Sequence, residues 1–232
     1  MHISAKLNAM EKRTMSQVDS SIEAMRQICY AIDNNMASDL VLKDKNISLF
    51  RWVNEGGESK VMKMLGDDKI QVGNVFSTRS RVIVHGVNCM GVMGAGIAAQ
   101  IRRNYPKAYS EYIKFINEHR IKQESPLGKA QFVDVGCGNY IVNAFTQENT
   151  AKRRGDVAIS YSAILMCMEE IKETCYCLGI DRIAMPKIGS DLGGGDWNII
   201  RSIINAVFND SRVEVTVYVL PSTFLKNVGT KF

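Results

Sequence analysis

Two glycine-rich segments stand out because each follows an apolar run and leads into a helical pattern. They are His85–Ala98, with the sequence HGVNCMGVMGAGIA, and Met185–Trp197, with the sequence MPKIGSDLGGGDW. Glycine lets backbone N–H groups approach phosphate oxygens, and a helix N-terminus adds unpaired donors and a positive dipole end. In an open sheet, ligands gather beyond the carboxyl ends of the strands. The pair of segments therefore predicts a site that holds an anion such as a diphosphate.

Four side chains in these segments could act on a bound substrate. His85 follows the first apolar run, and an imidazole with an ordinary pKa of about 6.5 can take a proton from water. The alternative for His85 is a hydrogen bond to the backbone. Asp191 and Asp196 supply carboxylates, although Asp196 is also a good N-cap for the helix that follows. Asn88 offers a donor and an acceptor to ribose hydroxyls, so we expect it to orient the substrate.

Common cofactor and metal motifs are absent from the sequence. The stretch Gly91–Gly96 reads GVMGAG, which differs from the dinucleotide fingerprint GxGxxG, and no GxxxxGK[ST] motif occurs. Six cysteines form no CxxC pair, and three histidines do not complete a zinc-binding pattern. We expect no cofactor and no metal.

Charge and hydropathy limit the classes of partner. The net charge is +5, but residues 1–68 hold 9 Lys and Arg against 10 Asp and Glu, and the rest of the chain holds 20 against 14. This modest excess fits a small anionic ligand or a solvated surface, and it does not favour a nucleic-acid partner. There is no apolar run of about 18 residues and no signal-like N-terminus, so we expect no membrane partner and a cytoplasmic location.

The elements that must position these segments are those of an α/β layer architecture. Six short apolar runs predict strands: Lys69–Val72, Val82–Val87, Ala130–Val135, Tyr140–Phe145, Arg182–Met185 and Val213–Val219. Helical patterns lie between them: Ala95–His119 with a break near Pro106, a buried stripe from Val157 to Leu178, and Asp196–Phe208.

An added segment precedes this region. Residues 1–66 are expected to form a mainly helical N-terminal extension of unknown function, residues 67–222 the main domain and residues 223–232 a tail. Apolar residues recur at helical spacing in the extension, namely Met15, Val18, Ile22, Met25, Cys29 and Ile32. We expect this amphipathic helix to pack against the main domain, with partner binding as the alternative.

Several separate motifs resemble those of the macrodomain family, the ADP-ribose-binding fold. They are Val82–Asn88, Met93–Ala98, Tyr105–Ala108, Pro186–Trp197 and Val215–Leu220, and the likeness covers roughly residues 69–220. The resemblance implies a three-layer α/β/α fold with a mixed central sheet of about six strands. It implies ADP-ribose, ADP-ribose-1″-phosphate or an ADP-ribosylated protein as the binding partner.

The resemblance also implies a role for each matching residue. Beside the adenine it places Gly73, Asn74, Val75 and Leu220. Around the diphosphate and the distal ribose it places Met93, Gly94, Ala95, Gly96 and Ile97. Closing over the phosphates it places Ile188, Gly189, Ser190, Leu192, Gly193 and Gly194.

The matching branch of the family includes ADP-ribose-1″-phosphate phosphatases and terminal ADP-ribose glycohydrolases. In the glycohydrolases a lysine and an aspartate act at positions that hold Gln147 and Gly193 here, which disfavours a mechanism through a lysine adduct. The first hypothesis is therefore a phosphatase that uses His85 with Asp191 or Asp196. The alternatives are a non-catalytic ADP-ribose-binding module and a hydrolase that removes ADP-ribose from macromolecules by another mechanism.

Overall fold

A six-stranded sheet forms the centre of the structure, a computed structural model that describes residues 22–34, 70–151 and 156–220. Its strand order is β1-β6-β5-β2-β4-β3, and β3 is antiparallel to β4 whereas the other neighbours are parallel. The strands are β1 (Ile70–Val72), β2 (Val82–Asn88), β3 (Ala130–Gly136), β4 (Asn139–Gln147), β5 (Arg182–Pro186) and β6 (Glu214–Val219). All six predicted strands are present, so the mixed sheet is confirmed.

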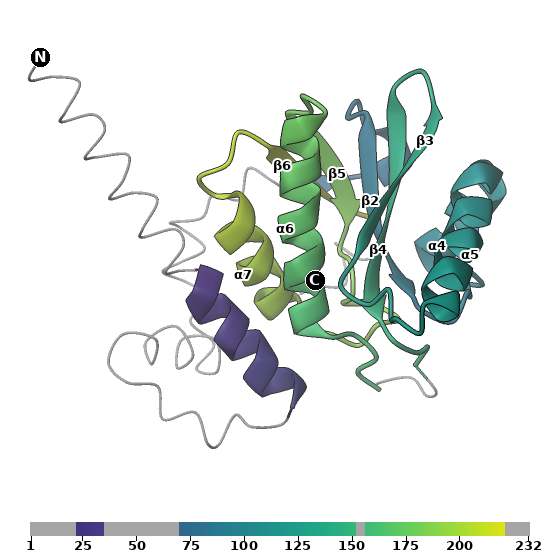
Figure 1. The fold of residues 1–232 in the computed structure, drawn as a ribbon. Coiled ribbons are helices and arrows are strands. Elements are labelled where there is room, and N and C mark those ends of the chain that lie inside the picture. The colour runs from purple at the N-terminus through teal and green to yellow at the C-terminus, as the bar shows by residue number, and fades with distance from the viewer. Residues whose placement is uncertain (1–21, 35–69, 152–155, 221–232) are drawn as a thin grey trace, which may run out of the picture.

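Helices cover both faces of this sheet, as Figure 1 shows. On one face lie α4 (Gly96–Asn104) and α5 (Pro106–Ile121), and on the other lie α6 (Tyr161–Cys177), α7 (Trp197–Phe208) and a helix over residues 22–33. The predicted three-layer fold is therefore confirmed. The predicted break is found as well, because Pro106 begins α5, where its missing N–H costs no hydrogen bond.

The central strand β2 shows why this sheet is buried on both faces. Val82 and Val84 pack into the core beneath α6 and α7, whereas Ile83 and Val87 face the side of α4 and α5. Successive side chains of a strand point to opposite faces, so a strand between two helical layers carries apolar side chains on both faces.

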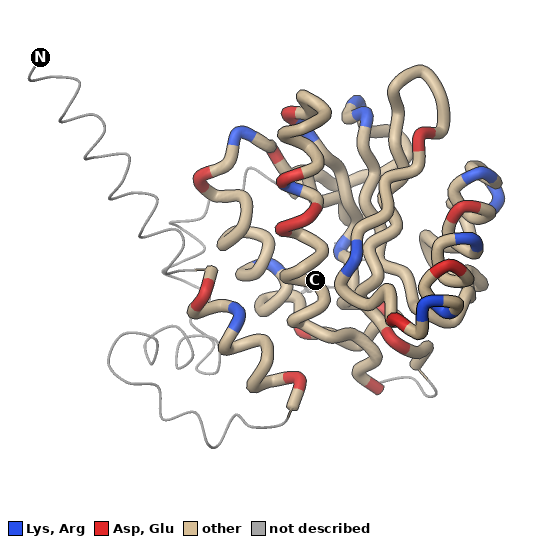
Figure 2. The backbone as a smooth tube through the Cα atoms, in the orientation of Figure 1, with Lys and Arg blue, Asp and Glu red and all other residues tan. Residues whose placement is uncertain are grey.

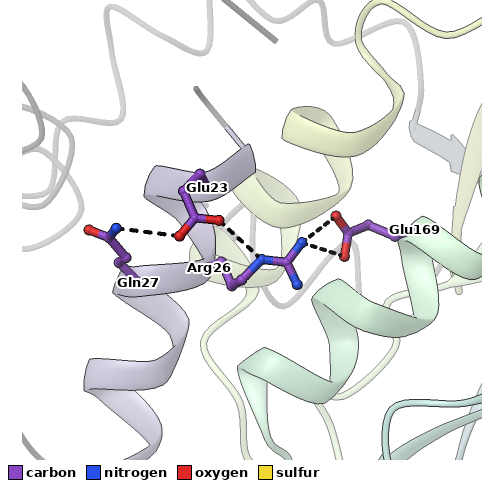
Figure 3. A network of polar contacts seen from close by, with 4 residues as sticks. All are labelled: Glu23, Arg26, Gln27 and Glu169. Carbon is purple, nitrogen blue, oxygen red and sulfur yellow. Dashed lines mark hydrogen bonds and ion pairs between the residues drawn. The ribbon is translucent and has the colours of Figure 1, made fainter. Parts of the chain in front are cut away.

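The helix over residues 22–33 packs on the main domain, as its amphipathic pattern predicts. Met25 and Cys29 are buried in the same core as α6 and α7. At its edge Arg26 reaches across to α6, with its Nη2 3.0 and 3.2 Å from the two carboxylate oxygens of Glu169 (Figure 3). Within the helix, Glu23 contacts both Arg26 and Gln27 (Figure 3).

Other parts of the predicted organisation differ from the structure or lie outside it. Both ends of the buried stripe predicted for α6 are wrong. Ser160 caps the helix before Tyr161, Leu178 is its C-cap, and Val157 and Leu178 are 60% and 43% exposed. The rest of the extension and the tail over residues 223–232 lie outside the described residues. Within the part of the chain that the structure describes, no helix combines the length and apolar character needed to cross a bilayer.

Candidate functional site

The carboxyl ends of the parallel strands surround a cavity of about 510 Å³. This is the volume of a typical small-molecule site. Two loops form its walls: a first glycine loop over residues 89–96, from the end of β2 to the first residue of α4, and a second glycine loop over residues 187–195, between β5 and α7. The floor comes from the ends of β2 and β4, and the segment after β1 closes one side.

Most of the predicted binding residues line this cavity. They are Gly73, Asn74, Val75, Asn88, Gly94, Ala95, Gly96, Ile97, Ile188, Gly189, Leu192, Gly193 and Leu220. These residues come from five separate parts of the chain, and the fold brings them together around one cavity. In the sequence, only the resemblance to a known family grouped them.

Three predicted binding residues do not line the cavity. Met93 is 2% exposed and packs in the core around Phe145, so it anchors the first glycine loop from below. The Ser190 hydroxyl donates to the carbonyl of Lys187 and thereby stabilises the turn of the second loop. Gly194 has a φ of +70°, and a Cβ there would collide with the carbonyl of Asp156, so this glycine serves the backbone path.

Glycine is required where the two loops approach their surroundings closely. Gly189 has a φ of +72°, and a Cβ on it would lie 3.2 Å from Ile200 and 3.3 Å from Ile159. Gly96 has a φ of +56°, and its Cβ would lie 3.5 Å from Leu192, which shows that the loops nearly meet. Gly96 and Gly189 both line the cavity, so backbone groups of the two loops form part of its wall.

His85 lies away from the cavity, contrary to the predicted contact with a ligand. Strand β2 continues to Asn88, so His85 is a mid-strand residue; it pairs in register with Asn143 and is fully buried. Its Nε2 lies 2.7 Å from Oδ1 of Asn143, and burial lowers the pKa of His85 to about 4 despite that hydrogen bond. His85 is not among the residues that line the cavity, so the structure gives no support to a ligand-facing base at residue 85, and its catalytic role stays a prediction.

The two candidate carboxylates are separated by the structure. Asp191 lines the cavity and is the carboxylate among its described lining residues. Asp196 is the N-cap of α7, where its Oδ1 accepts from the backbone N–H of Asn198 at 2.8 Å, and it does not line the cavity. The structural alternative for Asp196 is thus the one observed. No group of three or more His, Cys, Asp or Glu in the described chain could hold a metal ion.

The two asparagines at the cavity have their oxygens engaged in loop structure. Oδ1 of Asn88 accepts from the N–H groups of Met90 and Val92 and from the hydroxyl of Tyr112, and its Nδ2 donates to the carbonyl of Val92. Oδ1 of Asn74 accepts from the N–H of Phe76. Asn88 therefore fixes the start of the first glycine loop in addition to facing the cavity.

Sequence reasoning missed several polar residues that line the cavity, among them Lys187 and Thr146. Lys187 is the cation among the described lining residues; burial lowers the pKa of its ammonium group, Asp191 opposes that shift, and its Nζ lies 5.2 Å from the centre of the Trp197 ring. A lysine inside an anion-binding loop could have been noticed in the sequence. Thr146 is 1% exposed, and its hydroxyl has no partner among the described residues. Nothing in the sequence pattern pointed to it.

Gln147 and Gly193, which replace the lysine and aspartate of the glycohydrolases, are neighbours across the cavity floor. A Cβ on Gly193 would lie 2.8 Å from Nε2 of Gln147 and 2.7 Å from both Ile159 and the carbonyl of Gly189. A carboxylate side chain has no room at residue 193 in this arrangement. The predicted loss of that pair of catalytic groups agrees with the packing.

Comparison with known proteins gives one consistent family. The Macro domain family model matches residues 84–204, just over half of the chain. A DNA ADP-ribosyl glycohydrolase from Mycobacterium tuberculosis is 28% identical over 150 residues, which cover 63% of this chain and 40% of that protein. An ADP-ribose 1″-phosphate phosphatase from Scheffersomyces stipitis is 30% identical over 168 residues, covering 64% of this chain and 95% of that protein. The solved macrodomain of Mycobacterium tuberculosis DarG has a TM-score of 0.55 and 26% identity, covering 64% of this chain and 96% of that one. The chain thus spans less than half the length of the mycobacterial glycohydrolase.

Proposed function

The chain belongs to the macrodomain family, and we propose that it binds ADP-ribose in its cavity and hydrolyses the phosphomonoester of ADP-ribose-1″-phosphate. The observation that carries this proposal is the pair of glycine loops facing each other across a cavity of about 510 Å³. The cavity wall at the start of α4 suits a diphosphate, because this helix N-terminus has no side-chain cap and presents unpaired N–H groups to an anion. The phosphatase from Scheffersomyces stipitis, which the chain matches over 95% of that protein's length, supports the choice of substrate.

The reaction consumes one water molecule and yields ADP-ribose and inorganic phosphate. Water attacks phosphorus, the bond from phosphorus to the oxygen on C1″ breaks, and that oxygen takes up a proton. In our proposal the Asp191 carboxylate accepts a proton from the attacking water. The Lys187 ammonium offsets the negative charge of the phosphoryl group. Both side chains line the cavity, in contrast to His85.

A second candidate is removal of ADP-ribose from DNA. It is favoured by the match to the mycobacterial glycohydrolase and to the DarG macrodomain structure. In this case the scissile bond is the one between C1″ and the macromolecule rather than a phosphate ester. The crowding between Gln147 and Gly193 disfavours a lysine–aspartate mechanism for this glycohydrolase reaction. Asp191 would then have to activate the attacking water.

Product analysis with two substrates tests the proposal. The wild-type protein should release inorganic phosphate from ADP-ribose-1″-phosphate, and Asp191→Asn and Lys187→Met should each slow the release about 100-fold or more. His85→Gln should retain the activity, because residue 85 does not face the cavity. Release of ADP-ribose from an ADP-ribosylated DNA oligonucleotide without phosphate release would favour the second candidate. Tight ADP-ribose binding with neither product would mean that the chain is a binding module.

A further inference from the structure

The carboxylate of Asp33, outside the region that matches the family, caps the N-terminus of α6. Its Oδ1 accepts from the N–H of Tyr161 at 2.9 Å, and its Oδ2 accepts from the N–H of Ser162 at 2.9 Å and from the hydroxyl of Ser160 at 2.8 Å. The three donors are 127 to 129 residues away in the sequence. A carboxylate that accepts several hydrogen bonds at a helix N-terminus also gains from the helix dipole.

The segment that Asp33 holds is the support of the second glycine loop. Immediately before α6, the N–H of Ala158 donates to the carbonyl of Gly193 at 2.9 Å. The hydroxyl of Tyr161 accepts from the N–H of Asp196 at 2.8 Å, at the end of that loop. The loop is therefore tied on both sides to residues adjoining the Asp33 contacts.

Ile159 fills the space directly beneath the same loop. A Cβ on Gly193 or Gly195 would come within 2.7 Å of its side chain, and one on Gly189 would lie 3.3 Å away. The N–H of the next residue, Ser160, donates to the carbonyl of Thr146 at the end of β4, at 2.9 Å. Packing this close leaves little freedom, so a displacement of residues 158–161 must displace the cavity wall.

We propose that Asp33 is a positioning residue for the ligand site, and that the helix over residues 22–33 is part of that site's support. Through Ser160, Tyr161 and Ser162 it fixes the segment on which the second glycine loop rests. Loss of the carboxylate lets the start of α6 relax, and the loop loses the spacing that its backbone donors need around a diphosphate. The inference rests on the proposed function, since it takes ADP-ribose as the ligand.

Two variants of the same helix separate positioning from general stability. Asp33→Asn keeps the shape of the side chain but places an NH₂ group against at least one of the three donors. Arg26→Ala removes the exposed ion pair with Glu169 in Figure 3, which joins the same helix to α6 without touching its N-terminus. Both variants are compared with wild type at a temperature where circular dichroism shows each to be folded, and the ADP-ribose Kd is measured by calorimetry.

Asp33→Asn should weaken ADP-ribose binding about tenfold, whereas Arg26→Ala should leave the Kd within about twofold of wild type. Equal affinity of wild type and Asp33→Asn overturns the inference. So does a loss in Arg26→Ala as large as in Asp33→Asn, because it would reflect loosening of the whole helix. If Asp33→Asn does not fold, Asp33→Glu is measured in its place. Its longer side chain displaces the carboxylate, so ADP-ribose binding should again be weaker than in wild type. Absence of ADP-ribose binding by the wild type overturns the proposed function together with this inference.

Discussion

At the level of single residues, the buried His85 should make the folded chain sensitive to acid. Burial lowers its pKa from 6.5 to about 4 in the folded state. Between these values the unfolded chain binds a proton at this residue and the folded chain does not, so the free energy of unfolding falls as the pH falls. From pH 7 to pH 5 the contribution of His85 is a loss of about 2 kcal/mol. Urea denaturation at both pH values measures it.

The matched variants for this prediction are His85→Gln and His119→Gln. Glutamine at residue 85 cannot titrate but can still donate to Oδ1 of Asn143, the partner of the imidazole. His85→Gln should therefore lose less stability than wild type over the same pH interval, whatever its stability at pH 7. His119, whose Nδ1 lies 2.9 Å from the carbonyl of Phe115 on α5, provides the control substitution of a second histidine. An identical loss in wild type and His85→Gln would assign the acid sensitivity to other groups.

The residue positions that sequence reasoning placed wrongly share a physical cause. The type of a side chain shows which chemistry it can perform. Its position along a strand or loop determines whether it points toward the cavity or into the core. The predicted strand Val82–Val87 already contained His85, but alternation along β2 directs its side chain toward Asn143, which donates to the carbonyl of Ala108 of α5, rather than toward the cavity. Met93 was grouped with its glycine neighbours, yet an apolar side chain in a loop over a core is buried by the hydrophobic effect.

At the level of elements, α7 depends on the capping function of Asp196. Oδ1 of Asp196 satisfies the N–H of Asn198, one of the donors that a helix leaves unpaired at its first turn. Asp196→Ala should lower the free energy of unfolding by about 1 kcal/mol, and Asp196→Ser should largely preserve it, since serine also caps. Thermal or urea denaturation at neutral pH provides the measurement.

Phosphate release distinguishes this capping role from the catalytic one expected from the sequence. Both variants should retain activity on ADP-ribose-1″-phosphate at a temperature where they are folded, because Asp196 does not line the cavity. A large loss of turnover in Asp196→Ser, with stability preserved, would show that the Asp196 carboxylate takes part in catalysis.

The strands and helices were more predictable than the roles of single side chains, because the sequence patterns that indicate a strand or a helix are local. Short apolar runs marked all six strands, and Pro106 marked the boundary between α4 and α5. The start of α6 was misplaced because Val157 continues the apolar spacing into a segment that instead supports the second glycine loop. The cap from Asp33 could not be anticipated, since a contact spanning about 130 residues leaves no pattern in either segment.

At the level of the whole molecule, the distribution of charge separates a nucleotide-sized ligand from a polynucleotide. The net charge is +5. In the described structure, basic and acidic residues alternate along α5, whereas α6 carries Glu169, Glu170, Lys172 and Glu173 and is mainly acidic (Figure 2). The cavity itself contributes Lys187 and Asp191, of opposite sign. ADP-ribose binding should therefore involve about one ionic contact, whereas duplex DNA binding would need many.

The salt dependence of binding tests this conclusion. Between about 50 and about 200 mM salt, log K for ADP-ribose should fall only slightly as the salt concentration rises, because a small diphosphate lacks the condensed counterions that a polynucleotide releases on binding. An unmodified DNA duplex should bind weakly at the upper salt concentration, as fluorescence polarisation would measure. A duplex slope of about −4 or steeper together with tight binding would indicate a phosphate-tracking surface, and the substrate carrying ADP-ribose would then be sought among nucleic acids.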